Sequence, residues 1–327
     1  MKTTFFAAST LLLASAAHAE TPVLQVYAPD YFASEWGPGP GIEAGFEAQC
    51  GCDLKFVTGD VLPRLLLEGE RTEADVVIGL NTDVTARARA SGLFAPHGQN
   101  TDDLTMPIDW TDDTFLPFDY SYTAFIYDNT KMDNAPTSFD ALLALPDDTK
   151  IVIQDPRSST PGLGLLMWVK EAYGDRAEQV WEGLADNIVT VTPGWSEAYG
   201  LFLEGEADLV LSYTTSPAYH LIAEEDDTKI ALPFEEGHYL QVEVAGMLAG
   251  TDQPELARDF LQFITTDAFQ SAIPETNWMY PAKTPESGLP AGFETLITPA
   301  KSLIFSPDEA AEIRDTALQT WLSALSQ

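Results

Sequence analysis

Three segments of the chain share one plan, in which an apolar stretch leads through a polar turn into a predicted helix. They are residues 151–164 (IVIQDPRSSTPGLG), 190–200 (TVTPGWSEAYG) and 211–220 (LSYTTSPAYH). Ser159 or Thr160 is the candidate cap just before Pro161 in the first segment, and Ser216 directly precedes Pro217 in the third, which is typical of a helix start. The free N–H groups and the dipole of such a start favour an anion. The pattern therefore predicts two anion-binding helix ends.

Aromatic side chains accompany these turns. Trp195 lies at the start of the second predicted helix, and Tyr213 and Tyr219 flank the third turn. Each feature alone is ordinary, because Ser/Thr-Pro pairs mostly cap helices and a tryptophan mostly packs in a core. If the strands are parallel, however, all three turns lie at one edge of the sheet. Rings and anion-binding donors together predict a ligand with a flat aromatic or cationic part and an anionic tail.

Two further residues are candidates for the opposite wall of the site. Asp60 follows a predicted strand and either receives hydrogen bonds from an amino group, balances a cation, or simply caps the next helix. Trp278 lies in the segment NWMYP between helical segments, outside any helical stripe, which favours a binding role.

The elements that must position these residues alternate between short apolar strands and helices from Val23 onward. Such β-α-β-α order predicts an α/β fold with mainly parallel sheets flanked by helices. Two long extended segments, 116–129 and 229–248, interrupt the alternation. We interpret them as two extended crossover strands between two lobes, which describes a hinged clamshell with its ligand in the cleft at the carboxyl ends of the strands.

The expected organisation has four parts. They are a signal peptide at 1–19, a first lobe at 20–118 plus 240–305, a second lobe at 119–239, and a C-terminal helix at 306–327 packed on the lobes. The last helix opens with Ser306, Pro307 and Glu309, which form a capping box with proline at the first helical position.

The start of the chain predicts export. A short apolar stretch follows Lys2 and ends in the sequence Ala17-His18-Ala19, which is typical of a cleavage site. The stretch is shorter than the roughly 20 residues that a spanning helix needs. The net charge of -35 excludes general nucleic-acid binding. It fits either attraction of a cationic ligand or solubility in a salty habitat, and charge alone does not decide between them.

Cys50 and Cys52 are the only cysteines. In an exported chain they form a tight disulfide or remain free thiols, and a metal or redox role has little support without a nearby histidine. His97 lies in a loop, and His220 and His238 are expected to be structural or hydrogen-bonding. No Ser-His-Asp arrangement stands out, so we predict no catalytic residues, no metal and no cofactor.

Longer segments resemble the periplasmic thiamine-binding proteins of bacterial ABC importers, over almost the whole mature chain. The resemblance is carried by residues 35–40 (EWGPGP), 74–80 (ADVVIGL), 117–120 (PFDY), 154–166 (QDPRSSTPGLGLL), 194–220 (GWSEAYGLFLEGEADLVLSYTTSPAYH), 236–245 (EGHYLQVEVA) and 272–281 (AIPETNWMYP). It implies the periplasmic-binding-protein clamshell, a monomer in the periplasm, and capture of thiamine, thiamine monophosphate or thiamine diphosphate for delivery to an ABC permease.

The family's ligand contacts, carried over position by position, fall on Ser159, Thr160, Trp195, Tyr213, Thr214, Thr215, Ser216, Tyr219 and Trp278, with a further contact region at Gly59 and Asp60. The chain departs from the family in two places. The segment around Gly59 is several residues shorter, and Pro29 replaces a frequent tyrosine, whose part Tyr31 could take.

Three alternatives remain on the same fold. A ferric-iron-binding protein would use Tyr213, Tyr219 and His220, although the tyrosines are not neighbours and no carboxylate set accompanies them. An enzyme of the thiaminase I type would need an accessible, activated cysteine. A polyamine or a pyrimidine precursor is a third ligand class. A polyamine site, however, needs more carboxylates than the sequence predicts for this cleft.

Overall fold

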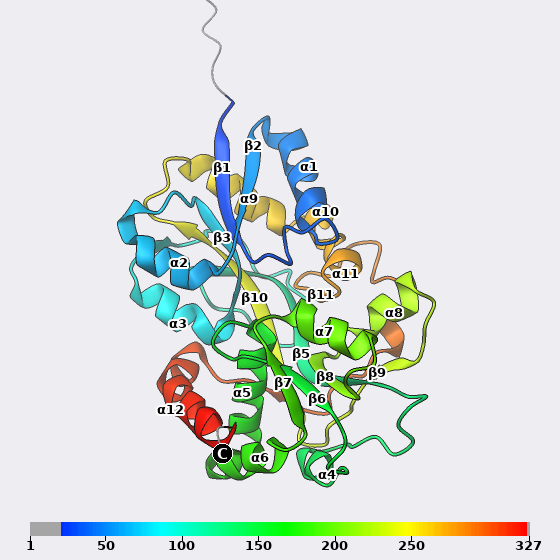
Figure 1. Ribbon diagram of the computed structural model, residues 1–327. Helices are drawn as coiled ribbons and strands as arrows, with labels where there is room; N and C mark the ends of the chain where they lie inside the picture. Colours follow the sequence, from blue (N-terminus) through cyan, green and yellow to red (C-terminus); the bar gives the residue numbers. More distant parts are fainter. Residues whose placement is uncertain (1–20, 326–327) are drawn as a thin grey trace, which may run out of the picture.

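The computed structural model describes residues 21–325, so the predicted signal peptide lies outside the described residues. These residues form a mixed sheet with helices on its faces (Figure 1). The main strand order is β2-β1-β3-β10-β5-β8-β6-β7, while β11 and β9 pair with β5, and β12 and β4 pair with β10. Among the described residues, no helix is both long and apolar enough to cross a membrane.

The strands are β1 (Val23–Ala28), β2 (Asp53–Thr58), β3 (Val76–Asn81), β4 (Phe94–Ala95), β5 (Phe115–Asp128), β6 (Ile151–Gln154), β7 (Ile188–Thr192), β8 (Leu209–Tyr213), β9 (Lys229–Ala231), β10 (His238–Leu248), β11 (Tyr280–Pro281) and β12 (Ser302–Leu303). The first nine helical segments are α1 (Gly39–Cys50), α2 (Val61–Glu68), η1 (Gly69–Arg71), α3 (Thr82–Ala90), α4 (Phe139–Leu143), α5 (Thr160–Tyr173), η2 (Gly174–Arg176), α6 (Ala177–Leu184) and α7 (Trp195–Leu203). The others are α8 (Pro217–Ala223), α9 (Pro254–Ile264), α10 (Asp267–Gln270), α11 (Ile273–Thr276), η3 (Phe293–Thr295) and α12 (Pro307–Leu325).

The sheet consists of two parallel groups joined by two long antiparallel strands. Strand β1 pairs in parallel with β2 and β3, and β6 pairs in parallel with β7 and β8. Strands β5 and β10 run antiparallel between the groups, and β5 changes partner along its length, from β10 to β8. The predicted parallel groups and the two extended crossings are therefore confirmed.

Apolar side chains from each group fill separate clusters. Around β6 and β8, helices α5 and α6 bury Trp168 and Trp181, with Phe125 and Phe139 beside Trp168. Around β1 and β3, Phe46 of α1 packs edge-on against Phe260 of α9 with ring centroids 5.1 Å apart. Burial of such rings from water is the main stabilising contribution to each cluster.

One local prediction at the chain's turns is confirmed, and one question that the sequence left open is answered. The Ser306 amide and hydroxyl both donate to Glu309 Oε2, at 2.9 and 2.6 Å, so the capping box forms at the start of α12. That helix then packs on α3, α5 and α6. Cys50 and Cys52 form a disulfide between the end of α1 and the start of β2, which excludes the free thiols that the sequence left open.

Candidate functional site

The three strand–turn–helix segments end at one edge of the second parallel group. The Asp155 amide donates to the Thr192 carbonyl at 2.9 Å, and the Ser158 hydroxyl donates to the Pro193 carbonyl at 2.8 Å, which joins the first turn to the second. Trp195 Nε1 donates to Ser212 Oγ at 2.7 Å, which joins the second segment to the third. The predicted meeting of the three turns is confirmed, and it follows from the parallel register of β6, β7 and β8.

The serine side chains do not cap their helices as predicted. Ser159 is the N-cap residue of α5, but its side chain makes no capping hydrogen bond. Ser216 occupies the same position at α8, yet its hydroxyl shares a 2.6 Å hydrogen bond with Ser212 Oγ and accepts from the Tyr213 amide at 3.2 Å. The competing partner is Ser212, which lies on β8 and points toward the turn. Ser216 therefore braces the turn.

The first turn of α5 lies close against the end of β6, at Gly162. A side chain at Gly162 would place its Cβ only 2.5 Å from the Gln154 carbonyl oxygen. Glycine is needed because any other residue would push the helix away from the strand. Gly162 therefore fixes the turn that carries Ser159, which is buried, and Thr160, which is half-buried.

One face of the Trp195 indole stacks on Tyr199, with centroids 4.7 Å apart and an interplanar angle of 25°. Tyr199 in turn shares a 3.0 Å hydrogen bond with His220 Nε2. The indole is half-buried, and its N–H is bound to Ser212. Its orientation is therefore fixed from two sides.

Tyr213 and the threonines that follow it point to the crossing strands. The Tyr213 hydroxyl donates to Gln241 Oε1 of β10 at 2.5 Å. Thr215 Oγ1 lies 2.9 Å and Thr214 Oγ1 3.4 Å from Ser121 Oγ of β5. Both threonines are fully buried. The third turn is thus held by its own hydroxyls onto β5 and β10.

Trp278 meets Tyr219 edge-on, with ring centroids 5.4 Å apart. Trp278 has a φ of 55°, a left-handed conformation that is rare for a residue other than glycine and often occurs at functional positions. Both rings are half-buried. The loop between α11 and β11 therefore brings Trp278 to the start of α8.

Asp60 and Gly59 are not joined to this group. Asp60 is exposed at the N-cap of α2, and its side chain makes no capping hydrogen bond, so the capping alternative is wrong. In the described part of the chain, no hydrogen bond, ion pair or ring contact links Asp60 to the three turns. Gly59 has a φ of 139°, which favours glycine, and its amide donates to the Ala28 carbonyl at 3.2 Å.

The two crossing strands bring together a buried acid pair that was not predicted from the sequence. Asp119 of β5 and Glu243 of β10 are direct cross-strand partners, 0% and 3% exposed. Asn277 Nδ2 donates to Asp119 Oδ2 at 2.6 Å and to Glu243 Oε2 at 3.3 Å, and the Tyr31 hydroxyl donates to Glu243 Oε1. Burial raises the pKa of both carboxyl groups, and the charge of Glu243 raises that of Asp119 further. The available signal was an acid within each apolar strand, in PFDY and QVEVAG.

His220 and His238 are held in hydrogen bonds, as expected. His238 Nε2 accepts from the Phe234 amide at 3.0 Å. Its Nδ1 donates to the Thr123 carbonyl at 2.9 Å, because a carbonyl oxygen can only accept. Burial lowers the pKa of His238.

His220, Glu224 and Asp226 are close enough to hold a metal ion, with ligand atoms within 4.8 Å of one another. Asp226, however, already accepts from Lys229 at 3.0 Å.

The tyrosines required for an iron site have other partners. The Tyr213 hydroxyl is bound to Gln241, and the ring of Tyr219 packs against Trp278 and His220. The geometry therefore gives no support to a shared ferric site at Tyr213, Tyr219 and His220.

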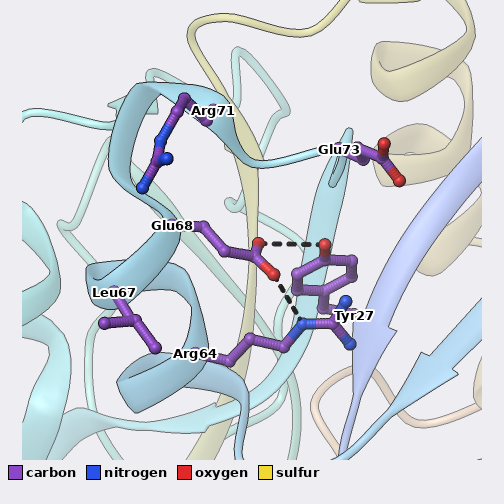
Figure 2. A pocket seen from close by; sticks show the side chains of 6 residues that line it. All are labelled: Tyr27, Arg64, Leu67, Glu68, Arg71 and Glu73. Carbon is purple, nitrogen blue, oxygen red and sulfur yellow. Dashed lines mark hydrogen bonds and ion pairs between the residues drawn. The ribbon is translucent and has the colours of Figure 1, made fainter.

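Two surface cavities lie away from these residues. The first, of about 410 Å³, is lined by Tyr27, Arg64, Leu67, Glu68, Arg71 and Glu73 (Figure 2). There the Arg64 guanidinium lies 4.2 Å over the Tyr27 ring and donates to Glu68 at 2.8 Å. The second, of about 610 Å³, lies along residues 131–149. Neither includes a predicted site residue, so cavity size alone does not locate the site.

Comparison with known proteins identifies the family. The sequence profile described as bacterial extracellular solute-binding protein matches residues 21–271. The chain is 51% identical to the thiamine-binding periplasmic protein of Escherichia coli (strain K12), over 97% of this chain and 98% of that protein. It is 47% identical to the thiamine-binding periplasmic protein of Brucella abortus biovar 1 (strain 9-941), over 99% and 98%.

Solved structures agree with this assignment. A periplasmic thiamin binding protein superposes with a TM-score of 0.91 at 51% identity, covering 97% of this chain and all of that chain. The apo ferric ion-binding protein A of Pasteurella haemolytica superposes with a TM-score of 0.77 at 16% identity, covering 93% and 98%, and shows the shared fold alone. The fold is thus the two-lobed clamshell of periplasmic binding proteins. The chain belongs to the bacterial extracellular solute-binding proteins and, within them, to the periplasmic thiamine-binding proteins.

Proposed function

We propose that the protein captures thiamine, and its monophosphate and diphosphate, between two lobes in the periplasm and delivers them to an ABC permease. In this proposal the first lobe comprises residues 20–118 plus 240–305, and the second lobe comprises residues 119–239. The helix at 306–327 packs on both lobes, and the chain is a monomer. One observation carries the proposal: aromatic rings from separate segments gather around the third turn, where Trp195 is bound to Ser212 and Trp278 packs on Tyr219.

The chemistry of thiamine fits this group. Its aminopyrimidine and thiazolium rings are flat, and the thiazolium carries a positive charge. The free face of Trp195 and the rings of Tyr213, Tyr219 and Trp278 can stack on or enclose such rings, which contributes about 0.5 to 2 kcal/mol for each cation–π contact. High identity to proteins named for thiamine binding supports the same ligand.

The hydroxyethyl arm and its phosphate fit the turns. Residues 159–162 open α5, a helix of 14 residues, so backbone N–H groups and the helix dipole favour an anion there. The segment 213–216 adds the hydroxyls of Thr214, Thr215 and Ser216. Gly59 and Asp60 would contact the ligand from the first lobe.

The state of the cysteines supports a binding role over thiaminase-type catalysis. The thiaminase-type mechanism requires a free thiolate as the nucleophile, and the two cysteines of this chain are bound to each other. We therefore expect release of intact thiamine.

Calorimetric titration tests the proposal. The chain without its predicted signal peptide (residues 1–19) is titrated with thiamine, thiamine monophosphate and thiamine diphosphate. Spermidine and ferric citrate are the controls. We expect tight binding of at least one thiamine form, recovery of unchanged ligand, and no heat from the controls. Absence of heat with all three thiamine forms would refute the proposal.

A further inference from the structure

One face of the crossing strands forms a continuous polar surface. Glu243 of β10 is the direct partner of Asp119 on β5 and of Asn81 on β3, and Gln241 is the partner of Ser121. Direct partners and residues two apart share a face of a sheet. These five residues, which we call the polar floor, are each no more than 4% exposed.

The polar floor holds two acids and no base. In the described part of the chain, no lysine, arginine or histidine forms an ion pair or a hydrogen bond with Asp119 or Glu243; their donors are Tyr31 and Asn277. Two neighbouring buried carboxylates repel each other, and desolvation adds to the cost. One proton held by the pair removes most of that cost, which agrees with the raised pKa of both groups.

Three atoms of the polar floor lack hydrogen-bond partners. They are Asp119 Oδ1, Gln241 Nε2 and Asn81 Oδ1, all buried. Proteins leave few buried polar atoms unpaired, because each costs about 1 to 3 kcal/mol. Two acceptors and one donor, beside an acid pair, indicate a partner that is polar and positively charged.

The predicted contact residues lie directly on this floor. Tyr213 is bound to Gln241, and Thr214 and Thr215 are bound to Ser121. Asn277, which bridges the two acids, precedes Trp278 in the chain. The acid pair is therefore at the base of the aromatic group.

We propose that Asp119 and Glu243 form the anionic subsite for the cationic ring of the ligand, and that the proton held by the pair leaves to solvent as the ligand binds. The inference rests on the proposed function and names the ligand class of the subsite, a planar organic cation. Charge is balanced, because one positive charge enters as one proton departs. An opposite charge within about 4 to 6 Å lowers a carboxyl pKa by about 1 to 3, which drives the release.

Two phenols face the pair, and a further buried carboxyl group acts on one of them. Tyr31 and Tyr213 face it from the loop after β1 and from β8, and burial with the charge of Glu243 raises the pKa of both phenols well above the usual range. Asp83 of α3, whose charge also acts on Tyr213, has a pKa raised to about 7 by burial and accepts from Tyr239 at 2.6 Å. Asp83 is therefore the matched control.

Proton counting by calorimetry tests the inference. Thiamine is titrated at one neutral pH in phosphate and in Tris, whose ionisation enthalpies differ, and then across a pH series. For the wild type we expect about one proton released per thiamine, and a Kd that rises by up to about tenfold for each pH unit of acidification. Asp119→Asn should abolish both effects and weaken binding at least tenfold, while Asp83→Asn should retain them.

Tyr31→Phe keeps both carboxyl groups and removes one donor to Glu243, so it should move the pH dependence of the Kd to higher pH. It remains informative if Asp119→Asn does not fold. Tight binding with no buffer dependence in the wild type, or equal proton release by Asp119→Asn, would overturn the inference and leave the proposed function standing. No binding of any thiamine form would instead refute the proposed function itself.

Discussion

Truncation of Trp195 should separate ligand binding from stability. One face of the indole stacks on Tyr199, with ring centroids 4.7 Å apart, so we expect the ligand to stack on the other face. In Trp195→Ala the ligand loses a desolvated cation–π contact of about 2 kcal/mol, which corresponds to a Kd weakened by about 30-fold. Folding loses the stacked pair and the hydrogen bond to Ser212, together about 2 kcal/mol.

Trp195→Phe tests which part of the indole matters. Phenylalanine retains a ring face but removes the N–H donor. Ser212 Oγ keeps its 2.6 Å hydrogen bond with Ser216, so no buried hydroxyl is orphaned. We expect a loss of about 1 kcal/mol in stability, and a Kd within about fivefold of the wild type.

The assay is calorimetric titration with thiamine at a temperature where urea denaturation shows each variant to be folded. The control is Trp110→Ala, because Trp110 is also half-buried and donates from Nε1 to the Phe115 carbonyl at 3.0 Å, at the start of β5. It should lose similar stability and bind normally. A Trp195→Ala variant that binds within threefold of the wild type would refute stacking on this ring. Equal losses in Trp195→Phe and Trp195→Ala would assign the role to the N–H instead.

Two further predictions concern stability. Asp83 is 3% exposed, and burial raises its pKa to about 7, so the stability it contributes is present below the unfolded pKa near 4 and is lost as pH rises through 7. Asp83→Asn should therefore raise the free energy of unfolding at pH 8, by up to about 4 kcal/mol, and by less at pH 5, as urea titrations at both pH values would show. The disulfide closes a very short loop, so serine at both Cys50 and Cys52 should cost only about 1 to 2 kcal/mol in urea and leave the Kd for thiamine unchanged; a large loss of affinity would contradict this.

The edge formed by the three turns could be predicted because its signals are local. An apolar strand followed by Ser/Thr-Pro marks both the end of a strand and the start of a helix, as at Thr160–Pro161 and Ser216–Pro217. Parallel pairing then places the ends of β6, β7 and β8 together. The prediction that Ser216 caps α8 was wrong for an equally local reason. Ser212, four residues earlier, is a competing partner for the Ser216 hydroxyl.

The polar floor could not be predicted, because it depends on register between strands that are far apart in the chain. Asp119 faces Glu243 only in the register observed between β5 and β10, which shifts next to Glu243. A slip by one residue would turn one of the acids to the opposite face. Local sequence shows an acid in each apolar strand but does not show that the two acids meet.

The burial of the acids also changes which group should balance a cationic ligand. From the sequence, Asp60 was the candidate to balance a cation, because it follows a strand in the expected cleft. Asp60 is exposed, so water and salt screen its charge and a nearby cation gains little from it. Asp119 and Glu243 are buried, where the effective dielectric is lower and each charge acts more strongly on its neighbours. A cation that displaces the proton from the buried pair exchanges one positive charge for another, and it gains the unpaired Asp119 Oδ1 as a partner.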